Sequence, residues 1–268
     1  MNPTLKDILA LLEELAPLRL AEPWDNPGLQ VGSYLQVIRK ISLALDPTLR
    51  SLRAAHSHKA QLLLTHHPLV LKPLSSVDIN GHPGEVIFGA IKGNVSVVSA
   101  HTNLDVAKGG INEILAGLLD LQDVEVLKET FGEDGVGLGR IGNLPEPVDL
   151  SAATETIRRI FGPESVNICG KADDRIHRVA VVGGSGGSLV PLAATKGADL
   201  LLTGDVSYHH ALEAEYLGII LIDVGHFATE KTAFGVFGKN LREKFAAEGW
   251  EVDLEVDEGE ADPLRRSG

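Results

Sequence analysis

Leu62-Leu63-Leu64-Thr65-His66-His67-Pro68 is a short apolar run that ends in two adjacent imidazoles and a proline. The leucines and the threonine predict a buried strand, and the proline predicts its end because it cannot donate to a sheet ladder. Ligands of open α/β sheets collect at the carboxyl ends of the strands. We therefore expect His66 and His67 at a binding site, with a simple strand-end cap as the alternative for each.

Outward from this stretch, predicted strands alternate with predicted helices. Strands are expected at 41–45 and 95–100, and apolar residues at helical spacing predict helices over 5–15 and 111–118. This alternation is typical of a largely parallel sheet with helices on its faces.

The pattern returns later in the chain. With Ile41 placed opposite Val179, the strand 62–65 aligns with a second Leu-Leu-Leu-Thr run at 200–203. The strand that follows is succeeded by His101-x-x-x-Asp105 in the first copy and by His226-x-x-x-Glu230 in the second. We interpret this match as an internal duplication.

The residues at these strand ends form a set with one chemistry: His66, His67, His101, Asp105, His226 and Glu230. Imidazoles combined with carboxylates suit first-row divalent metals such as Zn, Mn, Fe, Co or Ni. Neighbouring side chains diverge, so an adjacent histidine pair is better placed to serve two ions than one. In two-metal hydrolytic sites the ions lie about 3.5–4 Å apart, and a carboxylate can bridge them. His101 is predicted to be catalytic, either as a general acid/base or as a hydrogen-bond partner of a ligand.

The predicted fold class is α/β, with two similar three-layer α/β/α domains and a metal site in the cleft between them. The first domain is predicted to comprise 1–123 plus 231–268, and the second 124–230. The alternating pattern of 250–256 predicts an edge strand, and the acidic tail beyond Asp257 is expected to be solvated and passive.

Two other stretches leave alternatives open. The run Gly183-Gly184-Ser185-Gly186-Gly187-Ser188 is either an anion cradle or a tight turn between strand and helix, and the turn is favoured because no Walker lysine is present. His209 and His210 either line the site or cap a helix.

Composition excludes several function classes. The formal net charge is −13 and no Lys/Arg-rich run exists, so nucleic-acid binding is not expected. The single cysteine, Cys169, excludes an intrachain disulfide and fits a reducing compartment. No basic–apolar leader and no stretch of about 18 apolar residues is found, so we expect a cytoplasmic protein without membrane contact.

Five motifs together resemble the family of GTP cyclohydrolase I type 2 homologues, the NIF-three-like dinuclear metal centre proteins. They are Trp24-Asp25-Asn26-x-Gly28-Leu29, Thr65-His66-His67-Pro68, His101-Thr102-x-Leu104-Asp105 with Gly109-Gly110, Thr203-Gly204-Asp205 with Tyr208-His209, and Asp223-x-Gly225-His226-x-x-x-Glu230. The resemblance implies two divalent metal ions per chain and a toroidal homohexamer.

By the same resemblance, His67 and Asp105 would hold one ion, His66 and His226 the other, and Glu230 would bridge them. The implied activity is metal-dependent hydrolysis of a small molecule such as a nucleotide or related heterocycle, as in the opening of the imidazole ring of GTP. The alternative function is a non-catalytic metal-binding or regulatory scaffold, for instance a metal chaperone.

Overall fold

The computed structural model describes residues 2–130, 132–162, 166–170 and 175–264, which separate into two compact units. The first unit comprises residues 1–104 and 234–261, and the second comprises 105–233 with the residues after 261. Each unit is built on one mixed β-sheet. The protein is therefore an α/β protein with two sheets.

The sheet of the first unit has the strand order β1-β4-β3-β2-β11. β2, β3, β4 and β11 run parallel, and β1 pairs antiparallel with β4. β11 lies at the edge, as the alternating sequence of 250–256 predicts. The elements are α1 (Leu5–Leu15), η1 (Leu18–Leu20), β1 (Gly28–Val31), β2 (Lys40–Ala44), α2 (Leu49–Ser57), β3 (Leu62–Thr65), α3 (Gly84–Gly93), β4 (Ser96–Ser99), α4 (Thr102–Val106, which spans the division), and β11 (Asp253–Val256).

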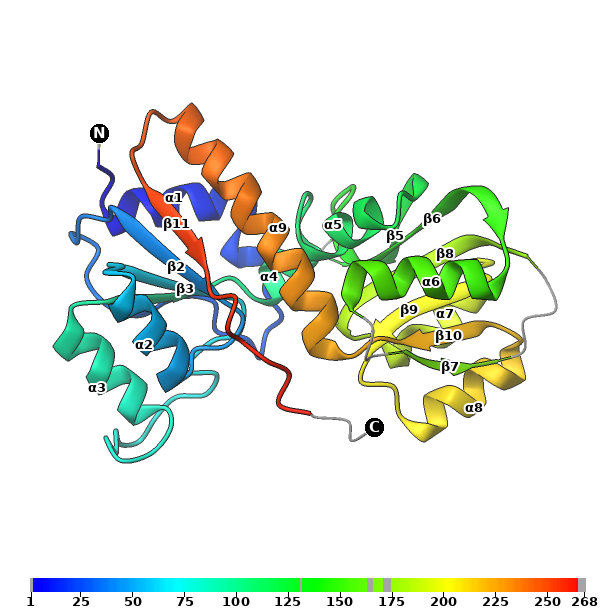
Figure 1. Ribbon diagram of the computed structural model, residues 1–268, viewed down its shortest axis with the longest axis horizontal. Helices are drawn as coiled ribbons and strands as arrows, with labels where there is room; N and C mark the ends of the chain where they lie inside the picture. The colour runs from blue at the N-terminus through cyan, green and yellow to red at the C-terminus, as the bar shows by residue number, and fades with distance from the viewer. Residues whose placement is uncertain (1, 131, 163–165, 171–174, 265–268) are drawn as a thin grey trace. The chain divides into compact units, whose positions relative to one another are not determined.

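Helices cover both faces of this sheet (Figure 1). Leu63 and Val97 pack with residues of α2 and α3 on one face. On the other face, Leu43 lies against Gly238 of the long helix α9 (His226–Ala247). Because both faces are buried, β3 has no polar alternation and reads as the continuous apolar run seen in the sequence.

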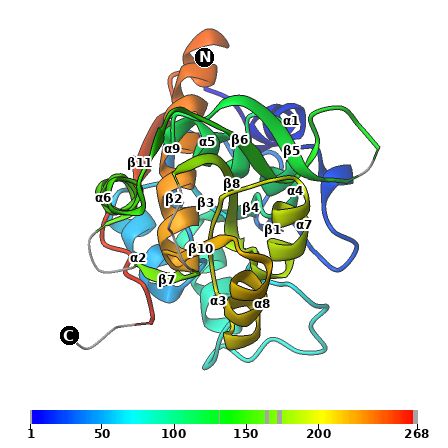
Figure 2. The ribbon, with the colours of Figure 1, turned by 90° about the vertical axis from the view of Figure 1, so that its right-hand side faces the viewer.

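The sheet of the second unit has the order β5-β6-β8-β9-β10-β7, with β8, β9 and β10 parallel and the outer strands antiparallel. Ala180 and Leu201 pack with α7 and α8, while α5 and α6 lie on the opposite face (Figure 2). The elements are α5 (Ile111–Leu118), β5 (Gln122–Glu129), β6 (Gly137–Val148), α6 (Leu150–Phe161), β7 (Asn167–Cys169), β8 (Ile176–Ser185), η2 (Gly187–Leu189), α7 (Val190–Thr195), β9 (Leu200–Gly204), α8 (Tyr208–Leu217), and β10 (Ile220–Asp223).

The division of the chain differs from the predicted boundaries at 123 and 230. Residues 105–123 group with the second unit because α5 packs on its sheet, where Ile111 and Leu115 lie within 3.2 Å of a Cβ built on Gly183. Helix α9 belongs to the second unit up to Ala233 and to the first from Phe234 onward. The hydrophobic periodicity of the sequence does not reveal where one helix passes from one unit to the other, because the spacing of its apolar residues does not change there.

The three central strands of each sheet pair in the same register. Ile41 pairs with Leu62 in the first sheet, and Val179 pairs with Leu200 in the second. Leu62 pairs in turn with Ser96, and Leu200 with Ile220. Ile41 and Leu62 are the positions that the sequence alignment of the two copies places opposite Val179 and Leu200.

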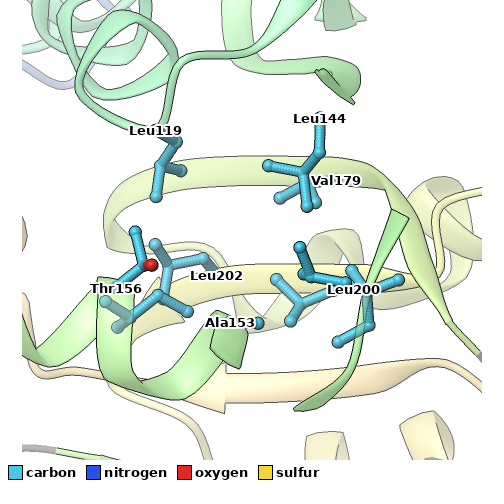
Figure 3. A pocket seen from close by; sticks show the side chains of 10 residues that line it. Leu119, Leu144, Ala153, Thr156, Val179, Leu200 and Leu202 are labelled. Atoms are coloured by element: carbon cyan, nitrogen blue, oxygen red, sulfur yellow. The ribbon is translucent and has the colours of Figure 1, made fainter. Parts of the chain in front are cut away.

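Packing under α6 leaves a small apolar gap of about 80 Å³. Leu119 and Val179 face it from one side and Leu202 and Ala153 from the other (Figure 3). Among the labelled side chains, Thr156 carries an oxygen atom and the others are apolar. The gap therefore lacks the several convergent polar groups of a ligand site.

The expectation that the tail beyond Asp257 is passive was wrong. The Glu260 carboxylate accepts hydrogen bonds from the backbone N–H groups of Leu45 and Asp46, and Asp257 pairs with Arg50. The tail is polar because its side chains make hydrogen bonds with backbone N–H groups and an ion pair with an arginine, and do not pack in a hydrophobic core. Residues 265–268 of the tail lie outside the described residues.

Within the described part of the chain, no helix combines the length and the apolar character needed to cross a membrane. Even the 22-residue helix α9 does not meet this condition.

Candidate metal centre

His66 follows the last residue of β3 and is completely buried. Its Nδ1 atom lies 2.8 Å from the carbonyl oxygen of Ala100. A carbonyl only accepts, so Nδ1 carries the proton and Nε2 keeps the lone pair that a metal would need. The ring of Phe234 packs against the imidazole, with 5.6 Å between the centroids.

His67 is the next residue, and a carboxylate orients it. Its Nδ1 lies 2.7 Å from Oδ1 of Asp46, which follows β2. Its backbone N–H donates to the carbonyl of Leu45, and its carbonyl accepts from the Thr65 hydroxyl. These bonds fix the turn after β3, and Nδ1 is again the atom engaged by the protein.

His101 follows β4 and has the same arrangement. Its Nδ1 lies 2.8 Å from Oδ1 of Asp25, whose side chain is fully buried. Burial raises the pKa of Asp25, but hydrogen bonds from His101 and Thr102 outweigh it and bring this pKa down to about 2. Asp25 is therefore a carboxylate at any ordinary pH and holds the imidazole in place.

The three histidines form one compact group in the first unit. Their potential ligand atoms lie within 4.8 Å of one another. The ring centroids of His66 lie 5.2 Å from those of both His67 and His101. The group could hold a metal ion, and it includes His101, to which the sequence assigned a catalytic role rather than a ligand role.

A second group that could hold a metal contains His226 and Glu230. They stand one turn apart at the start of α9, with Nε2 of His226 2.9 Å from Oε2 of Glu230. Nδ1 of His226 lies 2.7 Å from Oδ2 of Asp205, which follows β9. The hydrogen bond to Glu230, opposed by burial and helped by both carboxylate charges, raises the pKa of His226 to about 9.

The glycine run at the end of β8 lets Glu230 approach the sheet. Gly184 has a φ of +64°, and a Cβ at this position would lie 2.2 Å from Oε1 of Glu230. Its N–H donates to the hydroxyl of Thr229, 2.9 Å away. The first half of the run is the end of β8 and its last residues begin η2, so the expected tight turn is shorter than the run, and Gly184 packs closely against α9.

The remaining candidates have other positions. Neither metal-competent group found among the described residues includes Asp105, which lies in α4 and whose backbone carbonyl accepts from Asn112. His210 caps α8 together with Ser207, and exposed His209 contacts the ring of Tyr208. The ligand and catalytic assignments made from the sequence stay predictions.

The sequence did not predict the three carboxylates that orient the imidazole rings, which are Asp25, Asp46 and Asp205. Asp25 and Asp205 stand in the quoted motifs without an assigned role, and Asp46 was not singled out. A usable signal exists for Asp46 and Asp205, since each follows a predicted parallel strand, as the histidines do. Nothing in the spacing connects Asp25 to His101, which is 76 positions away.

Fold and site together define an α/β protein with two mixed sheets and histidine and glutamate groups that could hold metal ions. Residues 3–263 match the family model described as Duf34/NIF3 (NGG1p interacting factor 3). The chain belongs to this family, and the resemblance found in its motifs is confirmed.

Curated relatives cover almost the same length. The chain is 32% identical over 266 residues to a GTP cyclohydrolase 1 type 2 homolog of Clostridium acetobutylicum, covering 99% of each chain. It is 35% identical over 226 residues to the GTP cyclohydrolase 1 type 2 of Helicobacter pylori, covering 84% of this chain and 86% of the relative.

Two solved structures have the same fold. A Bacillus cereus protein related to NIF3 superposes with a TM-score of 0.92 at 26% identity, covering 100% of both chains. Reduced HcgD from Methanocaldococcus jannaschii superposes with a TM-score of 0.80 at 29% identity, covering 96% of this chain and 99% of the other.

Proposed function

We propose that this protein binds two divalent first-row metal ions and acts as a metal-dependent hydrolase on a nucleotide or related heterocycle. One observation carries the metal proposal. In all four candidate histidines Nδ1 is hydrogen-bonded, to a carboxylate in three of them and to a carbonyl in His66. This is the arrangement that orients metal-ligating imidazoles and raises their basicity.

The donor set suits the proposed ions. The first unit offers imidazoles, and the second offers an imidazole with carboxylates, which together satisfy two borderline divalent cations. We propose His67 and Asp105 for one ion, His66 and His226 for the other, and Glu230 as the bridge between them.

When bound, the two ions would lower the pKa of a water molecule and so supply a hydroxide near neutral pH. The residues of the chain supply the rest. Asp25 and Asp46 hold the imidazole rings, and His101, if it is not a ligand, is placed to move a proton. Histidine is the side chain that most often serves as a general acid or base.

The exposed ring of Trp24 favours a planar substrate in this proposal. Its side chain is 59% exposed although tryptophan gains by burial, and its ring meets the edge of His101 at 6.0 Å between centroids. Stacking of a nucleobase on an aromatic face contributes about 1–3 kcal/mol. Relatives named GTP cyclohydrolase 1 type 2 are consistent with such a base.

Metal content tests the first half of the proposal. Protein purified without added metal is expected to contain about two ions per chain by elemental analysis. His66→Ala and Glu230→Ala each remove a ligand and are expected to lose at least one ion. His209→Ala, an exposed histidine outside the site, is the matched control and should keep both. Full metal content in both ligand variants would reject the assignment.

Turnover tests the second half. Each metal is restored in turn and the protein is incubated with GTP and a panel of heterocycles, with product release followed by mass spectrometry. For the substrate found, Trp24→Leu is expected to raise KM about tenfold or more, and Trp24→Phe much less, because phenylalanine keeps a stacking face. Trp250→Phe serves as the control tryptophan. Full metal binding without turnover of any compound would favour the scaffold function.

A further inference from the structure

The segment after β11 contacts the turn that carries Asp46. The Glu260 carboxylate accepts the N–H of Leu45 at 2.8 Å with Oε2 and the N–H of Asp46 at 3.0 Å with Oε1. Two consecutive backbone donors are thus held by the two oxygens of one side chain. An ionised carboxylate is suited to this contact because both of its oxygens only accept.

The segment is itself anchored to the first unit. Both terminal nitrogens of Arg50 donate to the carboxylate of Asp257 at 3.1 Å. The backbone N–H of Asp257 donates to the carbonyl of Leu43, 2.8 Å away, which extends the pairing of β11 with β2 by one residue. Bidentate pairs of this kind fix direction as well as distance. Glu260 therefore stands at a defined place beside the turn.

The same turn orients His67. Oδ1 of Asp46 lies 2.7 Å from Nδ1 of His67, and the carbonyl of Asp46 accepts from the hydroxyl of Ser51 at 2.6 Å. The backbone of Asp46 is held through its N–H by Glu260 and through its carbonyl by Ser51. Its side chain direction depends on this backbone, and the His67 ring depends on that side chain.

We infer that Glu260 is a positioning residue of the metal centre, which acts through Asp46 on the orientation and basicity of His67. The metal part of this inference rests on the proposed function. Partners one bond removed from the metal change its affinity by about 10–100-fold when they are lost. Glu260 is one hydrogen bond further from the metal than Asp46 is. Its position in the sequence does not indicate this contact.

The test compares Glu260→Gln with Glu258→Gln, an exposed neighbour with the same charge change. Glutamine keeps one acceptor oxygen and turns an NH₂ group toward a backbone donor, so one of the two hydrogen bonds is lost. Co²⁺ titration of the metal-free proteins is followed by calorimetry and by visible absorption. We expect one of the two Co²⁺ ions to bind about tenfold more weakly, with an altered spectrum, only in the Glu260 variant.

A double-mutant cycle separates positioning from general loss of stability. If Glu260 acts through Asp46, Glu260→Gln combined with Asp46→Asn should bind Co²⁺ no more weakly than Asp46→Asn alone. Additive losses, or wild-type Co²⁺ binding by Glu260→Gln, would overturn the inference. Thermal unfolding of each metal-free variant checks that the fold is kept.

A metal-independent measurement keeps this outcome distinct from failure of the proposed function. Nitrogen NMR of the imidazoles reports which ring nitrogen of His67 carries the proton. In metal-free Glu260→Gln we expect the Nδ1–H signal of His67 to shift or broaden, and in Glu258→Gln to stay unchanged. If the wild-type protein binds no metal, the metal centre is wrong, while an unchanged His67 signal in Glu260→Gln rejects the positioning role.

Discussion

Each candidate histidine is held through its Nδ1 atom by another group of the protein. For His67, His101 and His226 the partner of Nδ1 is an aspartate, which favours the imidazole with its proton on Nδ1. A histidine that only capped a strand would have no need of such a partner. At the scale of single residues, the orienting aspartates separate a candidate ligand from a structural histidine.

His226 gives a prediction about protons. Its pKa is raised to about 9 by Glu230, so in the metal-free protein at pH 7 it is protonated and paired with that carboxylate. The stability from this pair is fully present below the ordinary pKa of 6.5 and is lost as pH rises through 9. A metal ion on Nε2 must displace the proton, so apparent affinity should rise up to about tenfold per pH unit from 7 to 9 and then level off.

Calorimetric titration in buffers of different ionisation enthalpy measures this proton. About one proton should be released by His226 per chain at pH 7, and the release should fall off above pH 9. In His226→Ala this contribution should disappear. A wild-type affinity that does not change between pH 7 and pH 9 would contradict the prediction.

At the scale of elements, the end of β8 and the first turn of α9 fit together closely. The N–H of Gly184 donates to Thr229, and the carboxylate of Glu230 occupies the space that a side chain at Gly184 would fill. The glycine run therefore contributes to the site through its lack of side chains.

Gly184→Ala and Gly197→Ala form a matched pair that tests this packing. Both positions have positive φ, +64° and +76°, so each alanine should cost about 1–2 kcal/mol of stability. Only the alanine at 184 would meet Glu230, because a Cβ at Gly197 has nothing within 4 Å. We expect metal content to fall in Gly184→Ala alone, measured by elemental analysis beside denaturant unfolding. Equal metal content in the two variants would contradict this reading of the glycine run.

At the scale of the whole molecule, the two sheets repeat one plan. Each has three parallel central strands in equivalent register, and the other strands are β1 and β11 in the first sheet and β5, β6 and β7 in the second. β1 and β7 each pair antiparallel with the third of these strands, whereas the strand on the other side is parallel in the first sheet and antiparallel in the second. Assembly into a ring of six chains stays a prediction, and sedimentation of the purified protein measures it.

The sequence by itself determined the alternation of strands and helices and the match between strands 62–65 and 200–203, and it offered the candidate histidines, because local periodicity and strand-end chemistry depend on neighbouring residues. It also determined the family, whose motifs extend over nearly the whole chain. It misplaced the division of the chain, because α5 joins the second sheet through packing that its own apolar spacing does not specify.

Only the tertiary structure decided which partner each imidazole has. Asp25 reaches His101 across 76 positions, and Glu260 reaches the turn of Asp46 across 214. Such pairs form because the sheet places strand ends and loops side by side in space, and hydrogen bonds depend on that proximity rather than on spacing along the chain. The same reason explains why the polar tail, which the sequence predicts to be passive, is hydrogen-bonded to the turn that holds Asp46.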